Sequence, residues 1–221
     1  MIKKLKVFKD RPKLGEFADF VLSCLIIVVV VILINSFIII SGYVPSGSME
    51  DLIMTHDRIL ANRTAYWGDS VPQRGDIVVF YAPDEKHPPA PVNSNYPAIP
   101  SKLVLYVKRV IGLPGETVTI KNNHVYIENN KTKGESKLLE EPYIPEGMVT
   151  MPLSATDTFT VPENCYFMLG DNRTNSSDSR AWRNTYVPVK DILGKVFWDY
   201  SLWPLDSIRF KTISSYNGYN I

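Results

Sequence analysis

Two segments carry side chains that could hydrolyse a bond: a serine-rich turn near the N-terminus and a lysine inside an apolar strand. The turn lies in Ser41–Asp51 (SGYVPSGSMED), where Ser46 and Ser48 flank Gly47. Glycine gives the backbone freedom to turn and leaves room above it, so we expect the Ser48 hydroxyl to face a substrate. Most serines are solvated surface groups, so a role for Ser48 as nucleophile depends on a base elsewhere in the chain.

Lys108 is the candidate for that base. It lies in the apolar run Ser101–Ile111 (SKLVLYVKRVI), where strand alternation places Lys108 and Arg109 on opposite faces. If Lys108 extends to the sheet edge, which is the commoner outcome, it stays an ordinary charged side chain. If it is buried, its pKa falls, and the neutral amine can then accept a proton from a serine hydroxyl.

A second dense polar segment is Gly170–Arg180 (GDNRTNSSDSR), which directly follows the apolar run Tyr166–Leu169. Such a segment is often only a turn whose Asn and Asp side chains bond their own backbone. Its place after a strand favours a further hypothesis. Asp178 and Arg180 could form a buried pair that orients a serine near the candidate site.

Composition restricts the classes of function. The chain has 221 residues, 45% hydrophobic and 21% charged, which is ordinary for a globular protein of one domain with a small insertion. The net charge of +1 gives no reason to expect nucleic-acid binding. Neither the cysteines nor the histidines show the spacing of a disulfide framework or a metal site, so we expect neither: Cys24, Cys165, His56, His87 and His124.

One apolar run is long enough to cross a membrane. Phe20 to Ile40 carries no charge and contains IIVVVVILI. A cleaved signal peptide and a buried core helix are weaker alternatives, because the run is long and no small-x-small cleavage site follows it. Basic residues precede the run, so the positive-inside rule predicts a cytoplasmic tail (1–16), a transmembrane anchor (17–40) and an outer body (41–221).

The outer body reads as short strands separated by turn residues. A proline-rich loop is expected over 82–101, and no repeat is apparent. This pattern predicts a mainly β domain on a single helical anchor. The expected strands are Asp57–Asn62, Gly75–Tyr81, Ser101–Ile111, 118–120, 124–127, Thr158–Val161, Tyr166–Leu169, Gly194–Trp198 and Ser207–Phe210.

Four segments, taken in order behind an N-terminal anchor, resemble the conserved boxes of bacterial type I signal peptidases: Ser46–Met49, Arg74–Val78, Lys108–Glu116 and Gly170–Arg180. The resemblance implies a membrane-bound serine endopeptidase, free of metal and cofactor, at the outer face of the cytoplasmic membrane. It would cleave signal peptides from exported proteins after small residues (Ala-X-Ala). A signal-peptidase-like fold implies a β catalytic domain with a small β insertion, here near 117–160, and we expect a monomer in contact with the bilayer.

The same resemblance assigns roles to individual residues. Ser48 corresponds to the nucleophile, Lys108 to the general base, and Ser46 with the Ser48 backbone N–H to the oxyanion-binding groups. Ser176 corresponds to a serine that hydrogen-bonds the lysine, and Asp178 and Arg180 to its supporting ion pair. The substrate would add as a strand along Tyr43–Pro45. Its small side chains would enter shallow apolar pockets walled by Val44, Ile53 and Val107.

Two segments depart from the family pattern. The family continues after Ser48-Met49 with a residue and then Pro-Thr, whereas this chain has Glu50-Asp51-Leu52, whose carboxylates could favour protonation of Lys108. Thr174 stands where aspartate is common. Two alternative functions stay open. One is a peptidase specialised for a few surface or pilin-like substrates, and the other is a non-catalytic family member that binds exported chains.

Overall fold

The computed structural model describes residues 12–83, 105–129, 134–201 and 208–214. The chain divides into two units, an N-terminal segment that ends at Ile39 and a body that begins at Ile40. Residues 1–11 of the expected basic tail (1–16) and nearly all of the proline-rich loop lie outside the described residues.

The N-terminal unit is the single helix α1 (Pro12–Phe37). Its span Glu16–Phe37, 22 residues, is apolar and long enough to cross a membrane, and its side chains are not buried in the protein. At ~1.5 Å per residue this span is about 33 Å long, close to the hydrocarbon thickness of a bilayer. The helix starts earlier than the expected anchor and ends before Ile40, because the isoleucines after it enter a strand, which β-branched residues favour.

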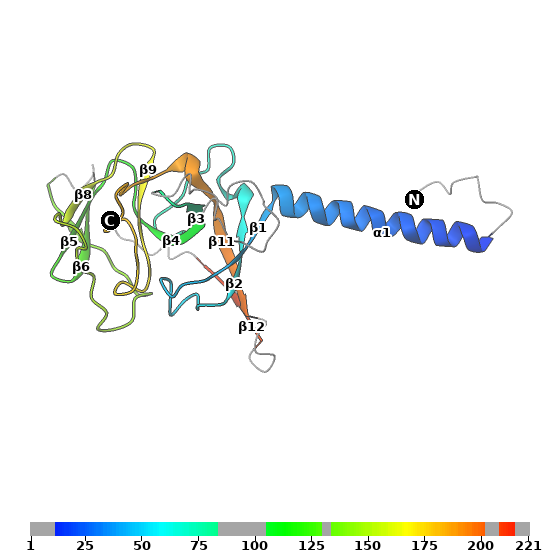
Figure 1. Ribbon diagram of the computed structural model, residues 1–221. Helices are drawn as coiled ribbons and strands as arrows, with labels where there is room; N and C mark the ends of the chain where they lie inside the picture. Colours follow the sequence, from blue (N-terminus) through cyan, green and yellow to red (C-terminus); the bar gives the residue numbers. More distant parts are fainter. Residues whose placement is uncertain (1–11, 84–104, 130–133, 202–207, 215–221) are drawn as a thin grey trace, which may run out of the picture. The chain divides into compact units, whose positions relative to one another are not determined.

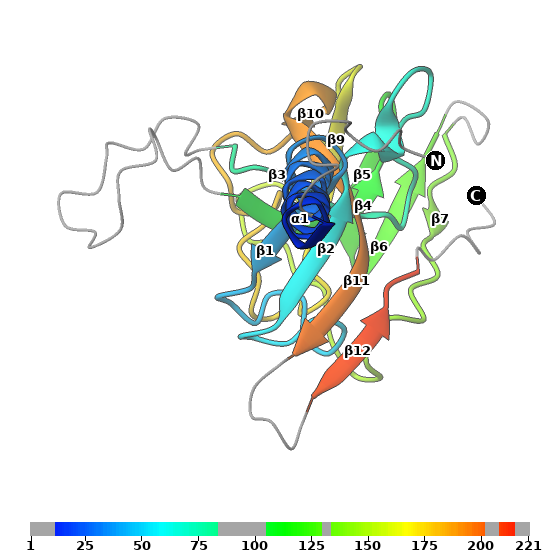
Figure 2. The same ribbon diagram turned by 90° about the vertical axis from the view of Figure 1, so that its right-hand side faces the viewer.

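The body contains a large sheet, in the strand order β1-β2-β11-β3-β4-β9-β10, with β12 paired to β11 (Figures 1 and 2). Where the pairing registers are given they are antiparallel, and β11 is a long central strand that pairs with β2, β3 and β12. The strands are β1 (Ile39–Tyr43), β2 (Arg58–Asn62), β3 (Ile77–Tyr81), β4 (Leu105–Gly112), β9 (Cys165–Leu169), β10 (Val187–Pro188), β11 (Ile192–Ser201) and β12 (Arg209–Thr212).

A second, four-stranded sheet has the order β7-β6-β5-β8. It forms from one continuous part of the chain between β4 and β9, and its strands are β5 (Thr117–Lys121), β6 (His124–Glu128), β7 (Lys137–Leu138) and β8 (Thr158–Thr160). Its core includes Phe159, which packs on Phe167 of β9 at 4.8 Å between ring centroids. The small sheet therefore shares its hydrophobic core with the large one.

Most expected strands are present with boundaries shifted by a few residues. The last one begins at Arg209 instead of Ser207, and β11 extends well beyond Gly194–Trp198. Three of the described strands are not among the expected ones. Two of them, β7 and β10, have only two residues each, too few to show a periodicity. The third, β1, begins at Ile39, inside the expected anchor. Short 3-10 turns at Arg63–Tyr66 and Val189–Asp191 complete the described elements.

Strand β4 controls the geometry of the candidate site. Strand β3 pairs with β4 in a register that places Val78 opposite Lys108 and Ile77 opposite Arg109. The two cations therefore project from opposite faces of the sheet, as alternation predicts. Lys108 thus shares a face with Val78 and with Val110, which belong to a buried apolar cluster. This cluster makes the surroundings of the lysine poor in water.

Candidate active site

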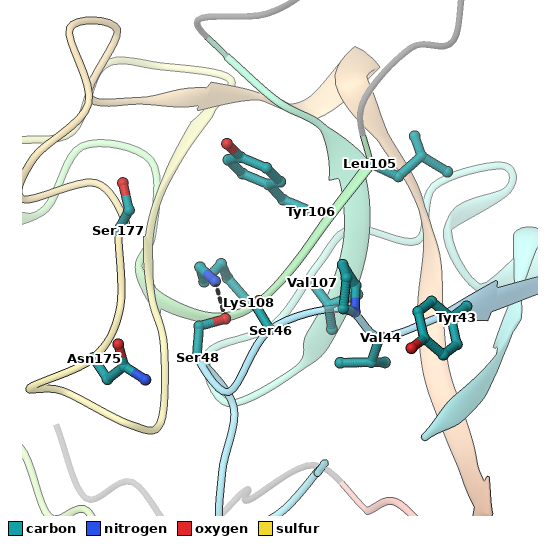
Figure 3. A pocket seen from close by; sticks show the side chains of 11 residues that line it. Tyr43, Val44, Ser46, Ser48, Leu105, Tyr106, Val107, Lys108, Asn175 and Ser177 are labelled. Atoms are coloured by element: carbon teal, nitrogen blue, oxygen red, sulfur yellow. Dashed lines mark hydrogen bonds between the residues drawn. The ribbon is translucent and has the colours of Figure 1, made fainter. Parts of the chain in front are cut away.

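Ser48 and Lys108 meet although they lie 60 residues apart. Lys108 Nζ and Ser48 Oγ are joined by a hydrogen bond of 2.5 Å, and Figure 3 shows the two side chains pointing toward one another. Lys108 is 5% exposed and Ser48 is 8% exposed. The alternative in which Lys108 extends to the sheet edge is therefore wrong.

Burial changes the acidity of the lysine. Loss of hydration disfavours the ammonium form and lowers the pKa of Lys108 to about 8. The carboxylates of Asp178 and Asp171 oppose this change, and the guanidinium of Arg180 adds to it. Near pH 8 a large fraction of the amine is therefore neutral and able to accept the proton of a hydroxyl in contact with it.

An open cavity of about 350 Å³ adjoins this pair. Val44 and Val107 line it, as expected for substrate pockets, and so do Ser46 and Tyr43 (Figure 3). Ile53 does not: it is fully buried in a core cluster under the serine loop, so the expectation that it walls a pocket is wrong. The remaining lining residues are Pro45, Ser48, Leu105, Tyr106, Lys108, Asn175 and Ser177.

The loop that carries Ser48 continues from the end of β1. Val44 extends the strand pairing, since its N–H donates to Asp57 O at 2.9 Å and its carbonyl accepts from His56 N at 2.8 Å. The next residue after the serine, Met49, is 1% exposed and packs in the core cluster. Anchors on both sides thus fix the short stretch that contains Ser48.

Gly47 serves a different purpose from the expected one. Its φ is not in the left-handed region, so the turn does not require glycine for its dihedral angle. A Cβ at Gly47 would instead lie 2.4 Å from Glu50 Oε2, a space that the glutamate already fills. Glycine at this position therefore leaves the space that the Glu50 carboxylate occupies.

The departing segment Glu50–Leu52 is tied to its own surroundings. Glu50 Oε1 accepts a hydrogen bond of 2.8 Å from Thr55 Oγ1, and Leu52 O accepts one of 3.2 Å from Lys211 Nζ on β12. The carboxylates that raise the pKa of Lys108 belong to the Gly170–Arg180 segment, not to Glu50 or Asp51. The expectation that the departing carboxylates protonate the lysine therefore has no support in the structure.

The Gly170–Arg180 segment contains the buried ion pair that its sequence suggested. Arg180 Nε and Asp178 Oδ1 are 2.8 Å apart, and neither side chain is exposed. Asp178 Oδ2 also accepts the N–H of Gly170 at 3.1 Å, and Arg180 donates to Arg173 O at 2.9 Å. The pair thus closes the loop on itself and fixes the backbone at its start.

A second buried ion pair was not predicted. Arg109, which follows Lys108, binds Asp171 through two hydrogen bonds of 2.8 and 2.6 Å. The available signal was the alternation in β4, because a second cation buried on the opposite face requires a carboxylate partner. Strand β4 thus places Lys108 against Ser48 and places Arg109 against Asp171 of the Gly170–Arg180 segment.

Ser176 does not make the expected hydrogen bond to Lys108. Its Oγ is buried and has no hydrogen-bond partner among the described residues. The atom lies beside Gly170, only 2.2 Å from where a Cβ on that glycine would stand. Within the described part of the chain, Ser176 therefore lines the space between Gly170 and the serine loop instead of bonding the amine.

The fold and the site define a mainly β protein with an apolar N-terminal helix and a buried serine–lysine pair at an open cavity. Residues 17–203 match the family model described as signal peptidase, peptidase S26. The chain therefore belongs to the bacterial type I signal peptidases.

Curated relatives agree with this family. Signal peptidase I of Pseudomonas aeruginosa is 31% identical over 90% of this chain and 77% of its own length. Signal peptidase I P of Bacillus subtilis subsp. natto is 32% identical over 91% of this chain and 97% of its own length. A crystal structure of a signal peptidase I from Enterococcus faecalis, 31% identical, superposes with a TM-score of 0.39 over 57% of this chain and 98% of that one.

Proposed function

We propose that the protein cleaves signal peptides with Ser48 as nucleophile and neutral Lys108 as general base. The observation that carries this proposal is the buried hydrogen bond of 2.5 Å between the two side chains. Lys108 takes the hydroxyl proton as Ser48 Oγ attacks the scissile carbonyl, and the resulting ammonium returns it to the leaving amine. The acyl-enzyme is then hydrolysed by a water that the same amine deprotonates.

The developing oxyanion requires donors beside Ser48. The Ser48 backbone N–H and the hydroxyl of Ser46, which lines the same cavity, are the proposed pair. The ion pair of Asp178 and Arg180 supports the neighbouring loop from within the protein. Ser176 is proposed as a supporting residue through its packing beside Gly170 rather than through a bond to the amine.

The edge of the large sheet offers a place for an extended substrate. Strand β1 ends the strand order, and the residues that follow it, Val44 and Pro45, line the cavity with Tyr43. A signal peptide would add there as a further strand, with its alternate side chains directed into the protein. Val44 and Val107 would wall shallow pockets that accept alanine-sized side chains, and cleavage would then follow an Ala-X-Ala sequence.

The apolar helix supports a membrane-bound arrangement with the N-terminus in the cytoplasm. The chain carries six basic residues before the apolar run, and the positive-inside rule retains such a flank in the cytoplasm. The body from residue 41 onward would then lie on the outer face, where exported precursors emerge. The substrates are thus the signal peptides of exported proteins, and the enzyme would act as a monomer at the bilayer surface.

A purified precursor tests this function. The full-length protein in detergent is expected to cut a precursor with an Ala-X-Ala site directly after the second alanine, as shown by mass spectrometry of both products. A matched precursor with leucine at that last position should remain uncut, because the pocket proposed between Val44 and Val107 would accept only alanine-sized side chains. Cleavage at another site, or equal cleavage of both precursors, would contradict the proposed specificity.

A further inference from the structure

We propose that Asn172 is a positioning residue for the oxyanion site, acting through the peptide group that joins Gly47 to Ser48. This inference rests on the proposed function, since it concerns the N–H of the proposed nucleophile. No motif in the sequence singled out Asn172 within the Gly170–Arg180 segment. The structure places it directly against the serine loop.

Asn172 holds two successive carbonyls of that loop. Its side-chain Nδ2 donates to Gly47 O at 3.0 Å, and its backbone N–H donates to Ser48 O at 3.1 Å. Both bonds join segments more than 120 residues apart in sequence, so they are tertiary constraints on the loop. One residue therefore fixes the peptide groups on both sides of Ser48.

The first bond helps to set the direction of the proposed oxyanion donor, together with a bond of 3.2 Å that the Glu50 N–H donates to the same Gly47 carbonyl. The carbonyl of Gly47 and the N–H of Ser48 belong to one planar trans peptide, so they point in opposite directions. A donor that holds Gly47 O therefore also aims the Ser48 N–H away from Asn172. The same bond polarises the peptide, which makes the Ser48 N–H a stronger donor to a negative oxygen.

Thr174 supports the orientation of the Asn172 amide. Gly47 O can only accept, so it requires the NH₂ end, and Thr174 Oγ1 donates to the opposite end, Asn172 Oδ1, at 3.3 Å. Thr174 is the position where the family commonly has aspartate. An ionised carboxylate has no proton to donate to Oδ1, so the threonine hydroxyl makes a contact that the usual residue cannot make in that form.

The rest of the segment holds Asn172 in place. The preceding residue, Asp171, is fixed by its two hydrogen bonds from Arg109 on β4. The carbonyl of Asn172 accepts the N–H of Asn175 at 3.1 Å. The side-chain amide is thus carried on an anchored backbone, so its contact with Gly47 O does not depend on a mobile loop.

The test replaces Asn172 by alanine in the full-length protein and measures precursor cleavage across pH. We expect kcat to fall about tenfold, less than the 10²–10³-fold typical of deleting an oxyanion donor, because the Ser48 N–H is misaligned but still present. KM should stay within about twofold, and the pH at which the rate reaches half its plateau should not move, because Lys108 is untouched. Asn184→Ala is the matched control, since Asn184 Nδ2 also donates to a backbone carbonyl, Pro83 O, at 3.2 Å.

Two further variants separate donation from packing. Asn172→Asp has the same shape but presents an acceptor to Gly47 O, so we expect it to be less active than Asn172→Ala at pH 8; a packing role predicts the reverse order. Thr174→Val removes only the exposed hydroxyl and should lower kcat about two- to threefold with an unchanged unfolding temperature.

Wild-type kcat in Asn172→Ala, or higher activity in Asn172→Asp than in Asn172→Ala, would overturn the role of Asn172 and leave the proposed function standing. If Asn172→Ala does not fold, wild-type kcat in Thr174→Val would contradict the proposal that Thr174 and Asn172 together position the Ser48 N–H. An inactive wild-type protein would instead contradict the proposed function itself.

Discussion

Replacement of Ser48 by alanine, or of Lys108 by methionine, is expected to lower kcat/KM for an Ala-X-Ala precursor by about 10⁴-fold or more, in line with the loss of one member of a catalytic pair. Ser48→Ala removes the atom that would form the acyl-enzyme. Lys108→Met keeps an unbranched stem close in length to the four carbons of the lysine side chain and lacks the amine. Quantitative cleavage assays with each purified variant measure both effects.

The dyad also predicts how the two substitutions combine. Since each removes the same chemical step, the double variant should be no slower than either single variant. Ser154→Ala and Lys137→Met are suitable controls because both residues are exposed, and they should retain wild-type rates. Multiplicative losses in the double variant, or appreciable cleavage by either single variant that still folds, would show that Ser48 and Lys108 do not act as a pair.

Gly170→Ala is expected to lower kcat by about 10²-fold. The free energy of unfolding should change by less than the activation free energy of the reaction. A Cβ at this position would lie 2.4 Å from Ser48 O, a backbone atom, and 2.2 Å from Ser176 Oγ. The loop that carries the nucleophile would have to move, and displacements near 1 Å in an active site can cost about 10²-fold in rate. Steady-state kinetics together with a thermal unfolding curve test this expectation.

A double variant identifies which of the two close contacts matters. Gly170→Ala with Ser176→Ala removes the hydroxyl but leaves the approach to the Ser48 carbonyl, so the activity should stay low. Full recovery in the double variant would show instead that Ser176 is the displaced group. In that case the close packing of Gly170 on the serine loop would not set the position of Ser48.

The sequence predicted the elements that follow local rules. The alternation of apolar and polar residues located most strands and placed Lys108 and Arg109 on opposite faces of β4. The uniform apolar run located the helix, although its C-terminal boundary depended on where pairing with β2 begins. The strand alternation and the apolar run both depend on residues that are close in sequence, so they can be recognised without the structure.

Apart from the Ser48–Lys108 and Asp178–Arg180 pairs, the contacts inside the site were beyond such reasoning. Ile53 is apolar and close to the serine, but whether it faces the cavity or the core depends on how the loop after Met49 turns. The role of Asn172 depends on two loops that meet from distant parts of the chain. Ser176 was assigned a bond by resemblance, whereas its hydroxyl lies beside Gly170, a position that only the packed loops determine.

The most direct test of the serine–lysine mechanism is the pH dependence of kcat/KM in the wild-type protein. Burial lowers the pKa of Lys108, so the amine becomes neutral, and the rate rises, as the pH passes through about 8. A single ascending limb near that pH is the expected result. A limb that appears only near the ~10.4 of a free lysine would contradict a buried neutral base.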